Sequence, residues 1–244
     1  MHVIDVKNPL QNYIWLLEDT QTQDAIVVDP TDAQLVQEYC QNHNLLLKQI
    51  WLTHWHTDHV AGASWLADRY QIVVYGPTEA LSRMNGICHL LKDVLDIKAH
   101  YFNFHDLKVE VIAVPGHTSG HIVFYIQQLN ALFSGDTLFA MGCGRVADER
   151  YKQMYQSLNR LKQLPLQTKV YCAHEYTLHN AEFAIKIDPH NVLLQKRLEE
   201  VRSLRAHNQM TIPTTIQLEH QTNPFFRTKD FNDFLNKRLL KDQY

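Results

Sequence analysis

The sequence predicts a layered α/β body followed by a helical C-terminal region. Short runs of β-branched and aromatic residues alternate with stretches of helical spacing as far as about residue 174. From about Leu178 onward the pattern is helical and charged. Mixed strands and helices followed by helices alone are typical of a layered α/β domain with a helical appendage. We therefore place a domain boundary near residue 174.

The expected strands are bounded by turn-forming or polar residues. They cover Tyr13–Leu17, Ala25–Asp29, Gln49–Thr53, Ile72–Tyr75, Lys108–Val114, Ile122–Ile126, Ala131–Ser134 and Lys169–Cys172. Between the second and third strands, Asp32–His43 has helical spacing, with Thr31 or Asp32 as its N-cap.

Further helices are expected at Ser64–Tyr70, Tyr151–Leu164, Ala181–Ile187, Asn191–Asn208 and Asp230–Leu240. A glycine-rich loop, MGCG at 141–144, precedes the helix that starts at Tyr151. A turn region, TNPFFR at 222–227, precedes the last helix.

The overall composition is that of an ordinary globular protein. The chain has 244 residues, 45% of them hydrophobic, and a formal net charge of −3, so no basic excess indicates a nucleic-acid partner. No apolar run is long enough to span a bilayer, and the N-terminus lacks a signal-peptide pattern. None of the four cysteines forms a CxxC pair, which favours reduced thiols and a cytoplasmic location. No apolar surface stripe stands out, so we expect a monomer.

The segment His54-Trp55-His56-Thr57-Asp58-His59 is the strongest chemical signal. At the end of an extended run, residues two apart point the same way, so His54 and His56 can reach one ion. Asp58 and His59 fall where the chain turns into the next helix, and they can address an adjacent position. Imidazole and carboxylate are suitable ligands for zinc, manganese or iron.

Three further motifs each follow an apolar, strand-like run: Gly116-His117, Ser134-Gly135-Asp136-Thr137 and Cys172-Ala173-His174-Glu175. Strand ends that feed loops are where a rigid sheet can direct several side chains at one point. By contrast, isolated histidines such as His43 and His105 are interpreted as surface or capping residues, and His121 as a support for its loop or the start of the next strand.

The motifs HxHxDH, GHTxGH, SGDTLF and CxHEYT, in this order, are similar to the motif series of the metallo-β-lactamase superfamily. The residues within these motifs resemble those of the glyoxalase II family. The resemblance implies a four-layer αββα sandwich with a C-terminal all-helical domain. It implies a catalytic domain at 1–174 and a substrate-binding domain at 175–244.

The same resemblance implies two divalent metal ions, zinc first, with iron or manganese as alternatives. The first ion would be held by His54, His56 and His117, the second by Asp58, His59 and His174, with Asp136 bridging them. Asp58 and Asp136 would act catalytically with a hydroxide that bridges the ions. Asp29 and Cys143 are candidates for hydrogen-bonding to the ligands and fixing the histidine tautomers. The alternatives are that Asp29 only forms an Asp-Pro turn and that Cys143 is a small buried thiol.

The implied reaction is hydrolysis of S-(2-hydroxyacyl)glutathione, such as S-D-lactoylglutathione, to a 2-hydroxy acid and glutathione, in methylglyoxal detoxification. The resemblance assigns substrate contacts to Arg145, Tyr176, Arg238 and Lys241. Without it, Arg238 and Lys241 would be a solvated basic face at a helix end. The segment Val146–Arg150 departs from the family pattern, which has an aromatic residue followed by Glu-Gly-Thr.

Three other functions are alternatives. An iron-dependent persulfide dioxygenase would use fewer of the seven positions and lack the basic tail. A nuclease would need a basic surplus, which is absent. A metal-binding protein without turnover is disfavoured by the intact ligand set.

Overall fold

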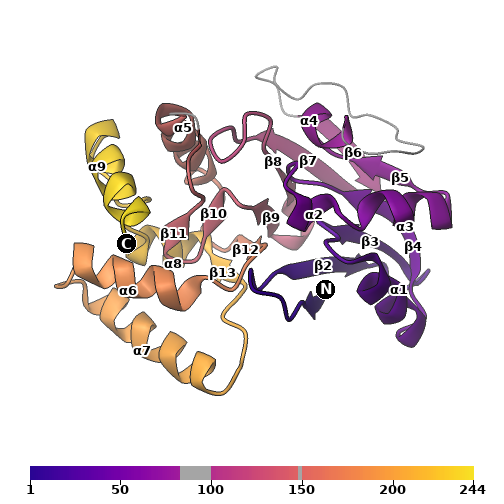
Figure 1. Ribbon diagram of the computed structural model, residues 1–244, viewed down its shortest axis with the longest axis horizontal. Coiled ribbons are helices and arrows are strands. Elements are labelled where there is room, and N and C mark those ends of the chain that lie inside the picture. The colour runs from indigo at the N-terminus through magenta and orange to yellow at the C-terminus, as the bar shows by residue number, and fades with distance from the viewer. Residues whose placement is uncertain (83–99, 148–149) are drawn as a thin grey trace. The chain divides into compact units, whose positions relative to one another are not determined.

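The structure, a computed structural model, describes residues 1–82, 100–147 and 150–244 (Figure 1). The chain forms two compact units. The first consists of residues 1–113 and 120–125, and the second of residues 114–119 and 126–244. Residue 174, where the sequence suggested a domain boundary, lies inside the second unit.

A five-stranded sheet is the centre of the first unit. Its strands follow chain order: β1 (His2–Asp5), β2 (Tyr13–Glu18), β3 (Asp24–Val28), β4 (Leu46–Trp51) and β5 (Val73–Tyr75). The first three are antiparallel, whereas β3, β4 and β5 run parallel. Parallel neighbours need a crossover connection, which α1 (Ala33–Asn42) and α3 (Ala63–Tyr70) provide.

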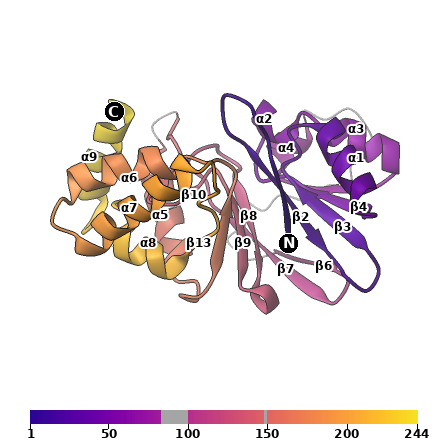
Figure 2. The same cartoon turned by 90° about the horizontal axis from the view of Figure 1, so that it is seen from below.

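Helices α1 and α3 cover one face of this sheet (Figures 1 and 2). Val36 of α1 and Leu66 of α3 share a buried cluster with Ile14, Leu16 and Val27 of the strands. The expected N-cap is confirmed at Asp32, whose side chain accepts the backbone N–H groups of the first helical turn.

The opposite face of the sheet packs on a second, antiparallel layer of the same unit. This layer contains β6 (His100–Phe104), β7 (Leu107–Ala113) and β8 (Ile122–Ile126). Trp51 of β4 lies with its ring centroid 5.3 Å from that of Phe102 and 5.1 Å from that of Phe124. The first unit is therefore a helix layer on two sheet layers, with short helices α2 (Thr57–Val60) and α4 (Thr78–Leu81) in its connections.

In the second unit, β9 (Ala131–Gly135) runs parallel to β12 (Lys169–Cys172), and β13 (Thr214–Thr215) pairs antiparallel with β12. Helix α5 (Tyr151–Leu161) lies between β9 and β12 in the chain. The glycine-rich segment, expected as a loop, instead forms part of a tight hairpin of β10 (Leu138–Phe139) and β11 (Gly142–Cys143).

Four helices complete this unit: α6 (Thr177–Ile187), α7 (Val192–Ala206), α8 (Ile216–Thr222) and α9 (Phe231–Asp242). Helices α6 and α7 lie side by side (Figures 1 and 2) and share a buried cluster with Met141 of the β10–β11 turn. Arg197 of α7 pairs with Glu219 of α8 at 2.8 Å, and both are buried. Glu219 also accepts the backbone N–H of Met141 at 2.7 Å, so α8 holds that turn in place.

The expected strands and long helices occur within a few residues of their predicted bounds. Among the elements that the sequence-based interpretation missed are β1, β6 and α8. Polar residues interrupt each of them, in the sequences HVID, HYFNF and IQLEHQT, so no clear hydrophobic pattern marked them. Among the helices of the described residues, none combines the length and apolar character that crossing a bilayer requires.

Candidate metal centre

In the first unit, two parallel strands end together and bring Asp29 beside Thr53. Val28 of β3 is in register with Trp51 of β4, and the N–H of Asp29 donates to the carbonyl of Trp51 at 2.9 Å. Because the strands are parallel, the residues that follow each of them lie at the same edge of the sheet. Asp29 adopts a left-handed backbone conformation, φ 50°, which turns its side chain out of the strand direction.

The buried Asp29 carboxylate is the hub of a hydrogen-bond network. Its Oδ1 accepts the backbone N–H of Thr53 at 2.8 Å, and its Oδ2 accepts the Thr53 hydroxyl at 2.7 Å. The same Oδ2 lies 2.9 Å from Nδ1 of His59. The Thr53 oxygen in turn lies 3.0 Å from Nδ1 of His54. Both histidines therefore carry their proton on Nδ1, and Nε2 is the atom each can offer to a metal.

The four residues expected as ligands from the HWHTDH segment are close together. Nε2 of His54 and Nδ1 of His56 are 3.0 Å apart, and Nε2 of His59 is 3.4 Å from Oδ2 of Asp58. His54 and His59 are fully buried, with ring centroids 4.0 Å apart. His121, which directly precedes β8, stacks on His54 with a ring-centroid distance of 4.7 Å.

The second unit brings Asp136, His117 and His174 together. Asp136 follows β9 and His174 follows β12, and these parallel strands end in register at Gly135 and Cys172. Asp136 presents one carboxylate oxygen to each histidine: Oδ2 is 3.6 Å from Nε2 of His117, and Oδ1 is 3.3 Å from Nε2 of His174. A carboxylate placed in this way is suited to bridging two ions.

The orientation of His117 is set by the β11 strand end. Its Nδ1 donates to the carbonyl of Arg145 at 2.8 Å, so Nε2 is again the potential ligand. Gly144 allows the β10–β11 hairpin to lie close to Asp136, because a Cβ at that position would be 1.8 Å from the carbonyl oxygen of Asp136. Any side chain there would push the hairpin away from Asp136.

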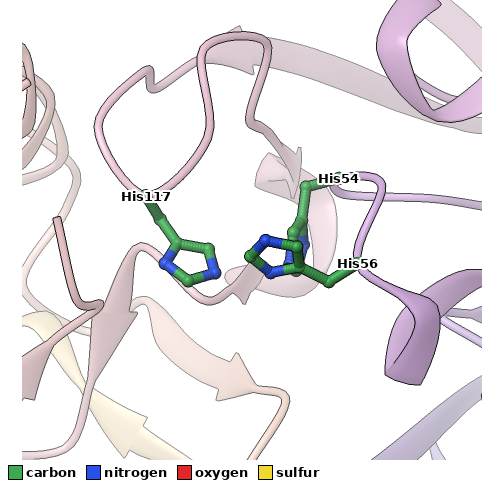
Figure 3. A group of neighbouring side chains, drawn as sticks. All are labelled: His54, His56 and His117. Carbon is green, nitrogen blue, oxygen red and sulfur yellow. The ribbon is translucent and has the colours of Figure 1, made fainter. Parts of the chain in front are cut away.

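Figure 3 draws the imidazoles of His54 and His56, which come from the segment after β4, and that of His117, from the loop before β8. His54, His59 and His117 each have Nδ1 held by an oxygen atom, of a hydroxyl, a carboxylate and a carbonyl respectively. Neutral imidazoles and carboxylates are the donors that divalent transition-metal ions take in hydrolytic sites. The donor chemistry therefore fits divalent metal ions.

Comparisons with known proteins show the family of the chain. The family described as Metallo-beta-lactamase superfamily matches residues 8–174, and Hydroxyacylglutathione hydrolase C-terminus matches residues 175–242. A hydroxyacylglutathione hydrolase of Pseudomonas entomophila is 45% identical over 91% of this chain and 84% of its own length. The chain belongs to the hydroxyacylglutathione hydrolase family.

A second relative and a solved structure support the family and the fold. A hydroxyacylglutathione hydrolase of Shewanella baltica is 42% identical over 90% of this chain and 82% of its own length. The crystal structure of the BLEG-1 B3 metallo-beta-lactamase superposes with a TM-score of 0.67 at 24% identity, covering 93% of this chain and 99% of that one. The expected metallo-β-lactamase fold, with a helical C-terminal region, is confirmed.

Of the substrate contacts expected in a hydroxyacylglutathione hydrolase, two lie on α9. Arg238 is buried, and it donates to the carbonyl of Cys143 at 3.0 Å and to Asp242 at 3.0 Å. The Lys241 Nζ lies 3.4 Å from the carbonyl of His179, on α6. Burial, and secondly the charge of Arg238, lower the pKa of Lys241 to about 8.

The other two expected contacts lie beside the donor residues. Tyr176 stacks on His174 with a centroid distance of 4.7 Å and an interplanar angle of 4°. The Arg145 side chain is exposed, while its carbonyl holds His117. In the divergent segment that follows, Asp148 and Glu149 lie outside the described residues.

Two residues near the donors were missed in the sequence. The Thr53 hydroxyl links the Asp29 carboxylate to Nδ1 of His54 by hydrogen bonds, and Asn12 donates a hydrogen bond to Asp58. Thr53 could have been found, because it directly precedes His54 and carries a hydroxyl. Nothing in the local sequence marks Asn12.

Proposed function

We propose that this chain hydrolyses the thioester of S-(2-hydroxyacyl)glutathione, with S-D-lactoylglutathione as substrate and D-lactate and glutathione as products. This is the second half of methylglyoxal detoxification. The proposal rests on two pairs of parallel strands, β3 with β4 and β9 with β12, whose ends are followed by oriented histidines and aspartates. The chain that carries them belongs to the hydroxyacylglutathione hydrolase family.

The proposal assigns two zinc ions to seven ligands. The first ion is assigned to His54, His56 and His117, the second to Asp58, His59 and His174, and the bridge to Asp136. Support comes from Asp136, which faces one histidine of each set with a different oxygen. The fixed tautomers of His54, His59 and His117 also leave Nε2 as the donor in each.

The residues of the chain then have separate tasks in the reaction. When bound, two divalent ions supply a water of lowered pKa as the nucleophile and positive charge for the developing oxyanion. Asp58 and Asp136 would offset only part of the positive charge that two divalent ions bring, so the site would keep an affinity for anions. The leaving thiolate needs little help from a general acid, because a thiol ionises near neutral pH.

We assign a catalytic domain to residues 1–174 and a substrate-binding helical domain to residues 175–244, with Arg145 as a further substrate contact from the catalytic domain. Glutathione carries two carboxylates, which suit the cationic side chains of Arg145, Arg238 and Lys241, and Tyr176 lies beside His174. The three described cysteines are free thiols, which suits a reducing cytoplasm. We propose a cytoplasmic monomer without a nucleic-acid or membrane partner.

The test is hydrolysis of S-D-lactoylglutathione by the purified protein, with metal analysis of the same sample. We expect turnover with about two zinc ions per chain. A thioester of the same acyl group on N-acetylcysteamine serves as the control, because it lacks the glutathione carboxylates and should show a much higher KM. Absence of turnover with both ions bound would refute the substrate assignment. A single iron with oxygen-dependent sulfur chemistry would instead support the persulfide dioxygenase.

A further inference from the structure

Asn12 connects the loop between β1 and β2 to the HWHTDH segment. Its side chain is buried, with 2% of the residue exposed. The amide Nδ2 donates to Asp58 twice, to the backbone carbonyl at 3.1 Å and to the carboxylate Oδ2 at 3.1 Å. One side chain therefore holds both the backbone and the carboxylate of Asp58.

The orientation of the Asn12 amide is fixed from behind by Asn8. The Asn8 Nδ2 donates to the Asn12 Oδ1 at 2.8 Å, and the Asn8 Oδ1 accepts the backbone N–H of Asn12 at 3.2 Å. The loop is closed by the N–H of Val6, which donates to the carbonyl of Asn12 at 2.9 Å. Since the amide oxygen already accepts a bond from Asn8, the NH₂ group has to face Asp58.

The two hydrogen bonds from Asn12 restrain Asp58 from outside its own helix. Helix α2 has only four residues and no side-chain cap. The Asp58 side chain is 24% exposed, and rotation of a carboxylate about its last torsion is intrinsically broad. A donor on Oδ2 selects one rotation, and the bond to the carbonyl fixes the backbone from which the side chain extends.

We propose that Asn12 is a positioning residue that holds Asp58 in the orientation needed to bind a metal ion. The proposal rests on the function proposed above, in which Asp58 is a ligand of the second ion. Asn12 acts through Asp58 and is not itself a ligand. Residues that orient a metal ligand in this way typically contribute about 10- to 100-fold to metal affinity.

The experiment compares zinc binding by the wild-type protein with that by Asn12→Ala, by competition with a chromophoric chelator. We expect the second ion to bind about 10- to 100-fold more weakly, while the first ion binds as in the wild type. Asn12→Asp keeps the acceptor for Asn8 but replaces the donor with an anionic oxygen. It should weaken the second ion at least as much, and it preserves the test if Asn12→Ala does not fold. Thermal unfolding of each apoprotein measures any purely structural loss.

A double-mutant cycle with Asp58→Ala decides between positioning and a general structural role. If Asn12 acts through the carboxylate, Asn12→Ala should have no further effect on zinc affinity once Asp58 is alanine. An equal loss in both backgrounds, or unchanged affinity of Asn12→Ala, overturns the proposal while the two-metal function stands. Binding of fewer than two ions by the wild type would overturn the proposed function and this inference together.

Discussion

The carboxylate of Asp29 and the imidazole of His59 lie 2.9 Å apart, from Oδ2 to Nδ1, and both side chains are buried. The same carboxylate reaches His54 through the Thr53 hydroxyl. In the proposed assignment, His54 and His59 bind different ions. A single buried carboxylate therefore sets the tautomers of one ligand in each of the two metal sites.

Asp29→Asn should weaken the binding of both ions. Asparagine tolerates the left-handed backbone of Asp29, so the fold should be retained, but its amide is a weaker acceptor for His59 and Thr53. We expect a loss of about 10- to 100-fold in zinc affinity, measured by chelator competition. Asp32→Asn, at the N-cap of α1, is the matched control and should leave zinc affinity unchanged. Wild-type affinity in Asp29→Asn would show that the network only supports the fold.

Asp136→Ala should abolish metal binding and activity together. Its two carboxylate oxygens face His117 and His174 separately, so its removal withdraws a donor from both ions. Metal analysis of the purified variant, beside its rate of S-D-lactoylglutathione hydrolysis, checks this. If the variant kept both ions at wild-type occupancy, the assignment of Asp136 as the bridge would be wrong.

The sequence was most informative where the donors come from one segment or from strand ends. His54, His56, Asp58 and His59 follow one strand, so their proximity could be predicted from spacing alone. Asp29, at the end of the predicted strand Ala25–Asp29, was a candidate for orienting the ligands beside the alternative of a turn-forming Asp-Pro, and its contact with His59 favours the orienting role. Asn12 could not be predicted, because its contact with Asp58 spans 46 residues and depends on a loop after β1, a strand that the sequence-based interpretation missed.

The C-terminal helix shows a second limit of local patterns. Helical spacing placed Arg238 and Lys241 on one face of α9, as either a solvated or a substrate-binding face. In the structure Arg238 is buried against the carbonyl of Cys143, whereas Lys241 is only partly buried. Two basic residues three positions apart thus have different environments, because burial depends on how α9 packs against β11, which is distant in sequence.

The lowered pKa of Lys241 predicts a pH-dependent KM. Because burial lowers that pKa to about 8, the ammonium is present below this pH and is lost as the pH rises through it. KM for S-D-lactoylglutathione should therefore rise above pH 8, by about tenfold if one charge-assisted hydrogen bond is lost. Steady-state kinetics across this range measure the effect. Lys241→Arg is the control, because arginine stays charged and should flatten the rise. A rise of equal size in that variant would assign the titration to another group.

Glu219→Ala should destabilise the protein far more than removal of an exposed carboxylate on the neighbouring helix. Glu219 is fully buried; it pairs with Arg197 and accepts the N–H of Met141, so its loss leaves the buried cation without its counter-charge and the Met141 amide without this acceptor. Breaking a buried pair from one side costs about 3–5 kcal/mol. Glu200→Ala removes an exposed partner of Lys196, 3.9 Å away, and should cost at most about 0.5 kcal/mol. Urea unfolding of both variants gives the comparison, and similar midpoints would mean that the Arg197–Glu219 pair adds nothing beyond a surface ion pair.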